Sequence, residues 1–149
     1  MIKVGKCAAL FVLAFLFSPL PAESQEPIEE ESSDKKSYKG LFTEAGYHLE
    51  FENYHLALHP YLQLDTMEPG NANIAYRIGL CYLNSANNRD KAIPYLEAAV
   101  KHATKNYDDL AYTEINAPLK AYYALASAYH LNYQLDAAIG TYKRYQALL

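Results

Sequence analysis

The chain has 149 residues and a formal net charge of −4, with 13 basic against 17 acidic side chains. This length suits one domain, and the acidic balance excludes the basic face that nucleic-acid binding normally needs. The sequence also lacks a glycine-rich phosphate loop and the Gly-x-Ser-x-Gly turn of many hydrolases, so we expect no enzymatic activity and no cofactor.

The N-terminal segment, 1–22, has the composition of a secretory signal peptide. Lys3 and Lys6 give a positively charged start, residues 7–17 are an unbroken apolar run, and small residues lead up to Ala22. The run is too short for a membrane-spanning helix, which needs about 20 residues. We expect cleavage after Ala22, which leaves no stable membrane span and places the protein in the periplasm or outside the cell. An uncleaved anchor is the alternative.

Residues 23–37 form an acidic linker. Six carboxylates lie between Glu23 and Asp34, and Ile28 is almost the only apolar side chain there. A segment of this composition buries too little apolar surface to become ordered. We interpret it as a flexible tether, and an acidic docking tail is the alternative.

The remaining sequence, from residue 38 to the end, repeats one pattern three times. A helical segment, apolar-x-x-apolar-small-x-x-Tyr, is followed by a second one with Ala-x-x-x-Tyr. The third copy is the clearest, the second has Leu96 in place of the last Tyr, and the first is weaker, with Glu44 and His48 at two positions. Small side chains let paired helices approach closely, and the large ones between them fill the grooves. The small positions are Ala45 with Ala57, Gly79 with Ala92, and Ala126 with Ala138. We predict helix pairs at 38–51 with 54–67, 72–85 with 90–104, and 117–131 with 135–148, with Asp90 capping the fourth helix.

The spacing of the small residues indicates a repeat. The interval from Ala45 to Gly79 equals one period of the pattern, and the longer interval from Ala92 to Ala138 leaves room for an insertion, at Tyr107 to Pro118. Pattern and period resemble the tetratricopeptide repeat, a helix–turn–helix unit of about 34 residues. The resemblance implies an all-α, right-handed superhelical solenoid with repeats at about 38–71, 72–106 and 119–149. An ordinary helical bundle is the alternative.

The resemblance also implies where a partner binds. In tetratricopeptide proteins the first helix of each pair lines a concave groove that holds a protein or peptide. The corresponding positions here are Lys39, Phe42, Leu49, Asn73, Tyr76, Leu80, Leu83, Asn84, Lys120, Tyr123, Ser127, His130 and Leu131. The lysine and asparagine that grip a C-terminal carboxylate in one subclass are absent. Phe42, Tyr76 and Tyr123 would instead form an aromatic stripe for an extended or helical apolar peptide.

Three phrases, at residues 73–83, 90–97 and 117–123, are similar to Bacteroidetes cell-envelope proteins. In those proteins tetratricopeptide repeats precede a WD40-like or TolB-like β-propeller and an OmpA-like peptidoglycan-binding domain, and some belong to the type IX secretion system. The resemblance implies an exported interaction scaffold of the bacterial envelope. The alternative is the leading fragment of a longer, peptidoglycan-anchored protein. Neither later domain occurs in these residues, so peptidoglycan binding is not carried over.

Two features could carry chemistry on a helix. His55 and His59 share one face and could begin a metal site, but leucines surround them and no Glu follows the first histidine, so we expect no metal. Cys81 is the one cysteine left after signal cleavage, and we interpret it as a buried, inert thiol. A reactive or intermolecular cysteine is the alternative.

The last predicted helix carries an apolar stripe formed by Ile139, Tyr142, Tyr145 and Leu149. Repeat arrays normally end in a helix with a polar outer face, and no such helix follows here. We expect part of the stripe to be exposed and to be covered by a following domain, a partner or a second copy of the chain.

Overall fold

A computed structural model describes residues 36–149. The predicted signal peptide and all of the acidic linker before Lys36 lie outside this range. The described residues are mostly helical, as the repeated pattern predicts. The helices are α1 (Tyr38–Glu50), α2 (Tyr54–Met67), α3 (Ala72–Leu83), α4 (Ala92–Val100), α5 (Lys120–Leu131) and α6 (Leu135–Leu148). No helix among them is both long and apolar enough to cross a membrane.

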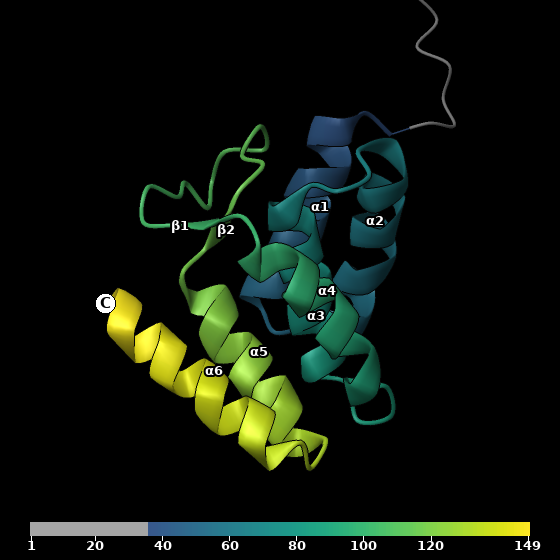
Figure 1. Cartoon of the computed structure of the whole chain (residues 1–149). Helices are drawn as coiled ribbons and strands as arrows, with labels where there is room; N and C mark the ends of the chain where they lie inside the picture. The colour runs from purple at the N-terminus through teal and green to yellow at the C-terminus, as the bar shows by residue number, and fades with distance from the viewer. Residues whose placement is uncertain (1–35) are drawn as a thin grey trace, which may run out of the picture. The chain divides into compact units, whose positions relative to one another are not determined.

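Each helix packs against the next one along the chain, and the three pairs α1–α2, α3–α4 and α5–α6 have the most extensive contacts (Figure 1). The predicted small positions lie at these contacts. Ala45, Ala57, Ala92 and Ala126 are fully buried. At Gly79 an added Cβ would lie only 2.5 Å from Cγ of Leu96 on α4, so α3 and α4 approach each other closely there.

The first and third pairs turn in the same way. Glu52 between α1 and α2 has φ 57°, and Tyr133 between α5 and α6 has φ 61°, so both lie in the left-handed region. The next residue closes each turn: the amide of Asn53 donates to the carbonyl of His48, and that of Gln134 donates to the carbonyl of Tyr129. The two turns, which are far apart in the sequence, therefore share the same backbone conformation and closing hydrogen bond.

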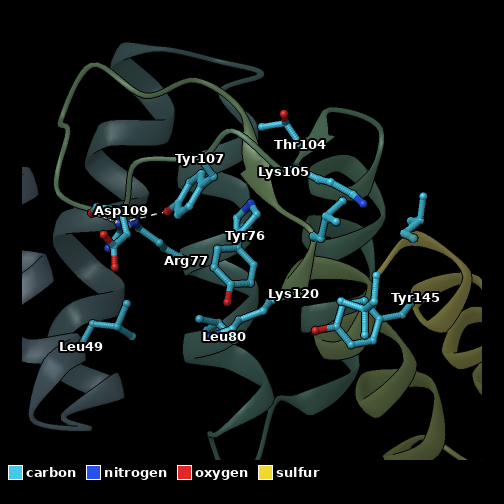
Figure 2. A pocket seen from close by; sticks show the side chains of 14 residues that line it. Leu49, Tyr76, Arg77, Leu80, Thr104, Lys105, Tyr107, Asp109, Lys120 and Tyr145 are labelled. Carbon is cyan, nitrogen blue, oxygen red and sulfur yellow. Dashed lines mark hydrogen bonds between the residues drawn. The ribbon is translucent and has the colours of Figure 1, made fainter.

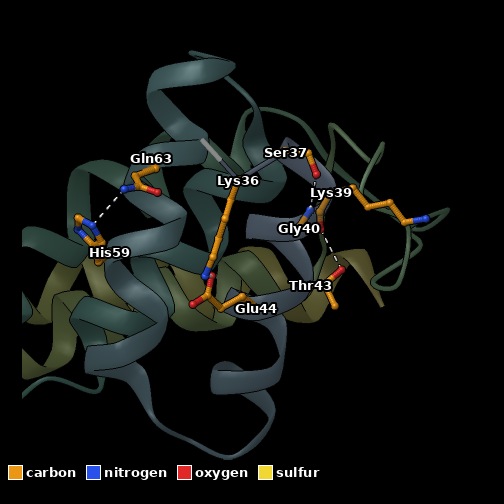
Figure 3. Close-up of polar contacts among 8 residues, drawn as sticks. All are labelled: Lys36, Ser37, Lys39, Gly40, Thr43, Glu44, His59 and Gln63. Carbon is orange, nitrogen blue, oxygen red and sulfur yellow. Dashed lines mark hydrogen bonds and ion pairs between the residues drawn. The ribbon is translucent and has the colours of Figure 1, made fainter. Parts of the chain in front are cut away.

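The helix starts are capped where the local sequence allows it. The Ser37 hydroxyl accepts from the amide of Gly40 at 3.2 Å (Figure 3), and the Asn71 side chain accepts from the amide of Ile74. The prediction that Asp90 caps α4 is wrong. Asp90 lies inside a short 3₁₀ turn, Arg89–Lys91, which leads directly into α4 without a side-chain cap.

The insertion is longer than predicted. α4 ends at Val100 instead of residue 104, and α5 starts at Lys120 instead of residue 117. Two short strands, β1 (Ala103–Thr104) and β2 (Ala117–Pro118), pair in parallel where helix was expected. The backbone of residues 103–104 satisfies its hydrogen-bonding groups across the base of the loop instead of along a helix. The insertion is thereby closed into a loop that lies beside α3, where the amide of Ala72 donates to the carbonyl of Ile115.

The expected stripe on α6 is divided. Tyr142 and Tyr145 are half-buried and pack against Tyr123 of α5, with ring centroids 5.6 and 6.0 Å apart. Ile139 and Leu149 are 53% and 76% exposed. The exposed part of the stripe is confirmed, and what covers it stays a prediction.

Candidate binding groove

A groove with a volume of about 560 Å³ lies among α1, α3, α5, α6 and the insertion. Its apolar surface comes mainly from Leu49, Tyr76, Leu80, Tyr145 and Leu148, and the insertion adds polar side chains along one border (Figure 2). The first helix of each pair contributes to this surface, α3 most of all, and α6 adds Tyr145 and Leu148. We call it the α3 groove because Tyr76, Arg77 and Leu80 of α3 all line it.

A second hollow of about 620 Å³ continues along α1 toward the tip of the insertion. It shares Leu49, Arg77 and Asp109 with the α3 groove, and Leu110, which is 86% exposed, lies at its border. The two hollows therefore meet at Arg77 and Asp109.

Four of the thirteen groove residues expected from the sequence line the α3 groove: Leu49, Tyr76, Leu80 and Lys120. At the far end of α5, His130 and Leu131 are exposed. Tyr123 is 54% exposed, and the Ser127 hydroxyl lies 3.0 Å from that of Tyr142, so both contact α6.

Several expected positions have other roles. Asn73 is fully buried beneath the insertion and cannot contact a partner, because its amide and carbonyl groups bond to Glu114, Tyr107 and Arg77. Phe42 is only 6% exposed, because the guanidinium of Arg77 covers its ring at 4.8 Å. It forms part of the wall of the second hollow, the one along α1. The aromatic stripe of Phe42, Tyr76 and Tyr123 is therefore not one open surface.

The last three of the expected groove residues, Lys39, Leu83 and Asn84, lie away from the α3 groove. Lys39 extends over the ring of Tyr112 in the insertion, with Nζ 5.6 Å from the centroid. Leu83 packs into the core between α3, α4 and α5. The Asn84 side chain donates to the carbonyl of Leu80 at the end of its own helix.

Arg77 is the central polar residue of the groove, and it is only 7% exposed. Its Nε donates to Oδ1 of Asn73 at 2.9 Å, and its Nη1 donates to the hydroxyl of Tyr61 at 3.1 Å. Nη2 donates to the hydroxyl of Tyr107 at 3.2 Å and to the carbonyl of Asp109 at 2.6 Å (Figure 2). One side chain of α3 thus connects the α2 core to the insertion and fixes the insertion beside the groove.

The partners of Arg77 are neutral. Burial raises the pKa of the Tyr61 and Tyr107 hydroxyls, and this effect exceeds the lowering effect of the nearby Arg77 charge. Both phenols therefore keep their protons at physiological pH. Within residues 36–149 the one salt bridge joins Lys36 to Glu44 (Figure 3), so no carboxylate is paired with the Arg77 guanidinium.

Sequence reasoning missed Arg77, Tyr107 and Asp109. An arginine in the middle of an amphipathic helix usually belongs to the solvated face. The one available signal was the spacing of Asn73 and Arg77, four residues apart on a helix, which allows a side-chain pair.

The two histidines of the possible metal site are exposed on α2. The ring of His59 is hydrogen-bonded to the Gln63 amide at 3.1 Å (Figure 3). Nowhere in residues 36–149 do three metal-binding side chains come together.

The buried position expected for Cys81 is confirmed, since the residue is fully buried in the core and is not part of a disulfide. Burial raises the pKa of its thiol to about 12.

The thiolate is the reactive form of a cysteine, so Cys81 should react with iodoacetamide at pH 8 at least about 100-fold more slowly than after unfolding in guanidinium chloride. A Cys7→Ser chain, alkylated and followed by mass spectrometry, measures this rate. Equally fast alkylation of the folded and unfolded chains would contradict the buried position.

In comparisons with known proteins, no family model, no curated protein and no solved structure matches the chain.

Proposed function

We propose that this protein is a non-catalytic interaction module of the tetratricopeptide type, which binds an extended segment of a partner protein in the α3 groove. The observation that carries the proposal is the groove itself, bordered by the first helix of each of the three pairs and rich in apolar and aromatic side chains. A concave apolar surface with a few converging polar groups is the usual form of a binding site.

The repeat interpretation has support from the backbone. The turns at Glu52 and Tyr133 have the same geometry, and the interval between them equals the interval between Ala45 and Ala126. Residues at equivalent places in the pattern thus occupy equivalent places in two helix pairs. A stack of such pairs is the arrangement of a solenoid.

The place of action is proposed from residues 1–22, whose composition is that of a signal peptide. We propose export to the bacterial envelope, with the resemblance to Bacteroidetes envelope proteins as the reason for expecting a scaffold there. The alternative proposal is that these residues are the N-terminal fragment of a longer peptidoglycan-anchored envelope protein, linked to type IX secretion.

The test places a photo-crosslinking amino acid at Leu80, inside the groove, in cells that express the full chain. A matched control has it at Leu56, which is 47% exposed on α2 and does not line the groove. We expect one defined crosslinked partner from position 80 and none from position 56. Equal crosslinking from both positions would contradict a groove-specific partner.

Tyr76→Ala with Tyr145→Ala should weaken this capture while helicity is kept, because both aromatic side chains line the groove. Aromatic anchors usually carry much of the interface energy, and the loss of such an anchor costs about 2 kcal/mol or more, or roughly 30-fold in affinity. Tyr133→Ala is the control, because Tyr133 is 90% exposed in a turn outside the groove. Capture is measured as crosslinked yield and helicity by circular dichroism. Unchanged yield in the double variant would show that the aromatic side chains do not hold the partner.

A further inference from the structure

The α3 groove contains a buried positive charge without a counter-ion among the described residues. Arg77 makes four hydrogen bonds, all to neutral groups, and its Nη1 makes only one of the two that it can donate. A charge removed from water is costly unless an opposite charge or many hydrogen bonds compensate it. Four hydrogen bonds and the rings of Phe42 and Tyr61 offset part of this cost. None of these groups carries a negative charge, so the positive charge of Arg77 still favours an anion at the border of the groove.

Two further cations line the same groove. Lys105 of the insertion and Lys120 at the start of α5 are exposed, and neither is part of a salt bridge within the described range. Figure 2 shows the side chain of Arg77 on the side of Tyr76 where Asp109 and Tyr107 lie, and that of Lys105 on the other side. Asp109 is the one acidic side chain that lines the groove, so the lining side chains carry three positive charges against one negative charge.

The local charge is opposite to that of the chain, whose formal net charge is −4. A positive hollow on an acidic protein attracts and orients a negative ligand, because the potential of grouped charges adds up within a concave surface. The apolar side chains beside these charges exclude a small inorganic anion as the best fit, since Tyr76, Leu80 and Leu148 would stay uncovered.

We propose that the α3 groove binds a peptide segment of a partner protein in which an Asp or Glu side chain stands next to apolar residues. The carboxylate is placed beside Arg77, with Lys105 and Lys120 as further cations that line the same groove, and the apolar side chains pack on Tyr76 and Leu80. This inference rests on the proposed function and defines its partner chemistry. It differs from recognition of a chain terminus by a lysine–asparagine pair, because its charges come from another position of α3, from the insertion and from the first residue of α5.

The test is selection of random octapeptides, displayed on phage inside a larger protein so that they have no free ends, against the immobilised full chain. We expect enriched sequences that combine Asp or Glu with Leu, Ile, Val or an aromatic residue. Synthetic capped forms of the enriched peptides, each with a partner in which Asp or Glu is replaced by its amide, are then measured by fluorescence anisotropy. The acidic form should bind about tenfold more tightly, and the difference should shrink between about 0.05 M and 0.5 M salt as screening increases.

The protein variant that removes the charges is Lys105→Gln with Lys120→Gln. Both side chains are exposed, so the fold should be unaffected, whereas a change at Arg77 would also release the insertion. The matched control is Lys101→Gln with Lys143→Gln, which changes the net charge equally at exposed sites outside the groove. The groove variant should lose the preference for the acidic peptide over its amide, and the control should keep it.

The outcomes separate the inference from the proposed function. Enrichment of neutral or basic peptides whose binding needs Tyr76 overturns the acidic partner and leaves the groove function standing. Absence of enrichment, or binding that is unchanged in Tyr76→Ala, overturns the groove function itself. Tighter peptide binding after Glu29, Glu30 and Glu31 are changed to Gln would make the chain's own acidic segment the occupant and overturn the assignment to a separate partner.

Discussion

Gly79→Ala should destabilise the protein by about 1–2 kcal/mol, although the same change in an ordinary helix is stabilising. Alanine is favoured over glycine within a helix by about 0.5–1 kcal/mol. At position 79 the new Cβ would lie 2.5 and 2.6 Å from two carbons of Leu96, which is fully buried in the core. Overpacking of this kind costs about 1–3 kcal/mol, so it outweighs the gain in helix propensity. Gly79→Leu should destabilise more strongly.

Gly140→Ala is the matched control, because Gly140 lies within α6 and a Cβ there meets no atom within 4 Å. This change should stabilise the protein by about 0.5–1 kcal/mol. Urea denaturation of the unmodified chain, Gly79→Ala and Gly140→Ala, followed by circular dichroism, measures the free energies of unfolding. An equal gain in stability for Gly79→Ala and Gly140→Ala would show that α3 and α4 do not approach as closely as described.

Arg77→Met should release the insertion from the helices and lower the global stability by about 1–3 kcal/mol. The hydroxyl of Tyr61 is fully buried, and Arg77 is its one hydrogen-bond partner among residues 36–149, so it would be left there without a hydrogen bond. Tyr107 and Asn73 would keep the bond between them, and the carbonyl of the exposed Asp109 could bond to water. The largest effect should therefore be local, as faster amide exchange in residues 101–119.

A second substitution separates the effect of the unpaired Tyr61 hydroxyl on stability from the effect of releasing the insertion. In Arg77→Met with Tyr61→Phe, the buried hydroxyl is removed together with its donor, and much of the lost stability should return. Amide exchange of the insertion should stay fast, because the bonds to Tyr107 and Asp109 are still missing. Arg144→Met, at an exposed site on α6, should change stability by no more than about 0.5 kcal/mol. Unchanged exchange of the insertion in Arg77→Met would show that Arg77 does not hold it.

The helical part of the fold was predictable from the sequence because side-chain spacing determines which residues share a helix face. The bounds of α2 and α6 agree with the prediction, and those of α1 and α3 differ by one or two residues at their ends. Ala45, Gly79 and Ala126 were recognised as close contacts between helices because small residues recurred there at one period. These features depend on neighbours within a few turns along the chain, which the sequence contains.

The form of the groove depended on the tertiary structure. The insertion has no periodic pattern, so its sequence does not indicate which helix face it covers, and the positions carried over by resemblance assumed an open concave surface. In the folded protein the insertion buries Asn73 and holds Arg77 against Phe42, and it adds Lys105, Tyr107 and Asp109 to the border. Arg77 and Tyr107 are 30 residues apart and belong to different elements, so only the folded chain brings them within hydrogen-bonding distance. Helix periodicity is a local property, whereas the burial and charge of a site depend on long-range contacts that no local pattern encodes.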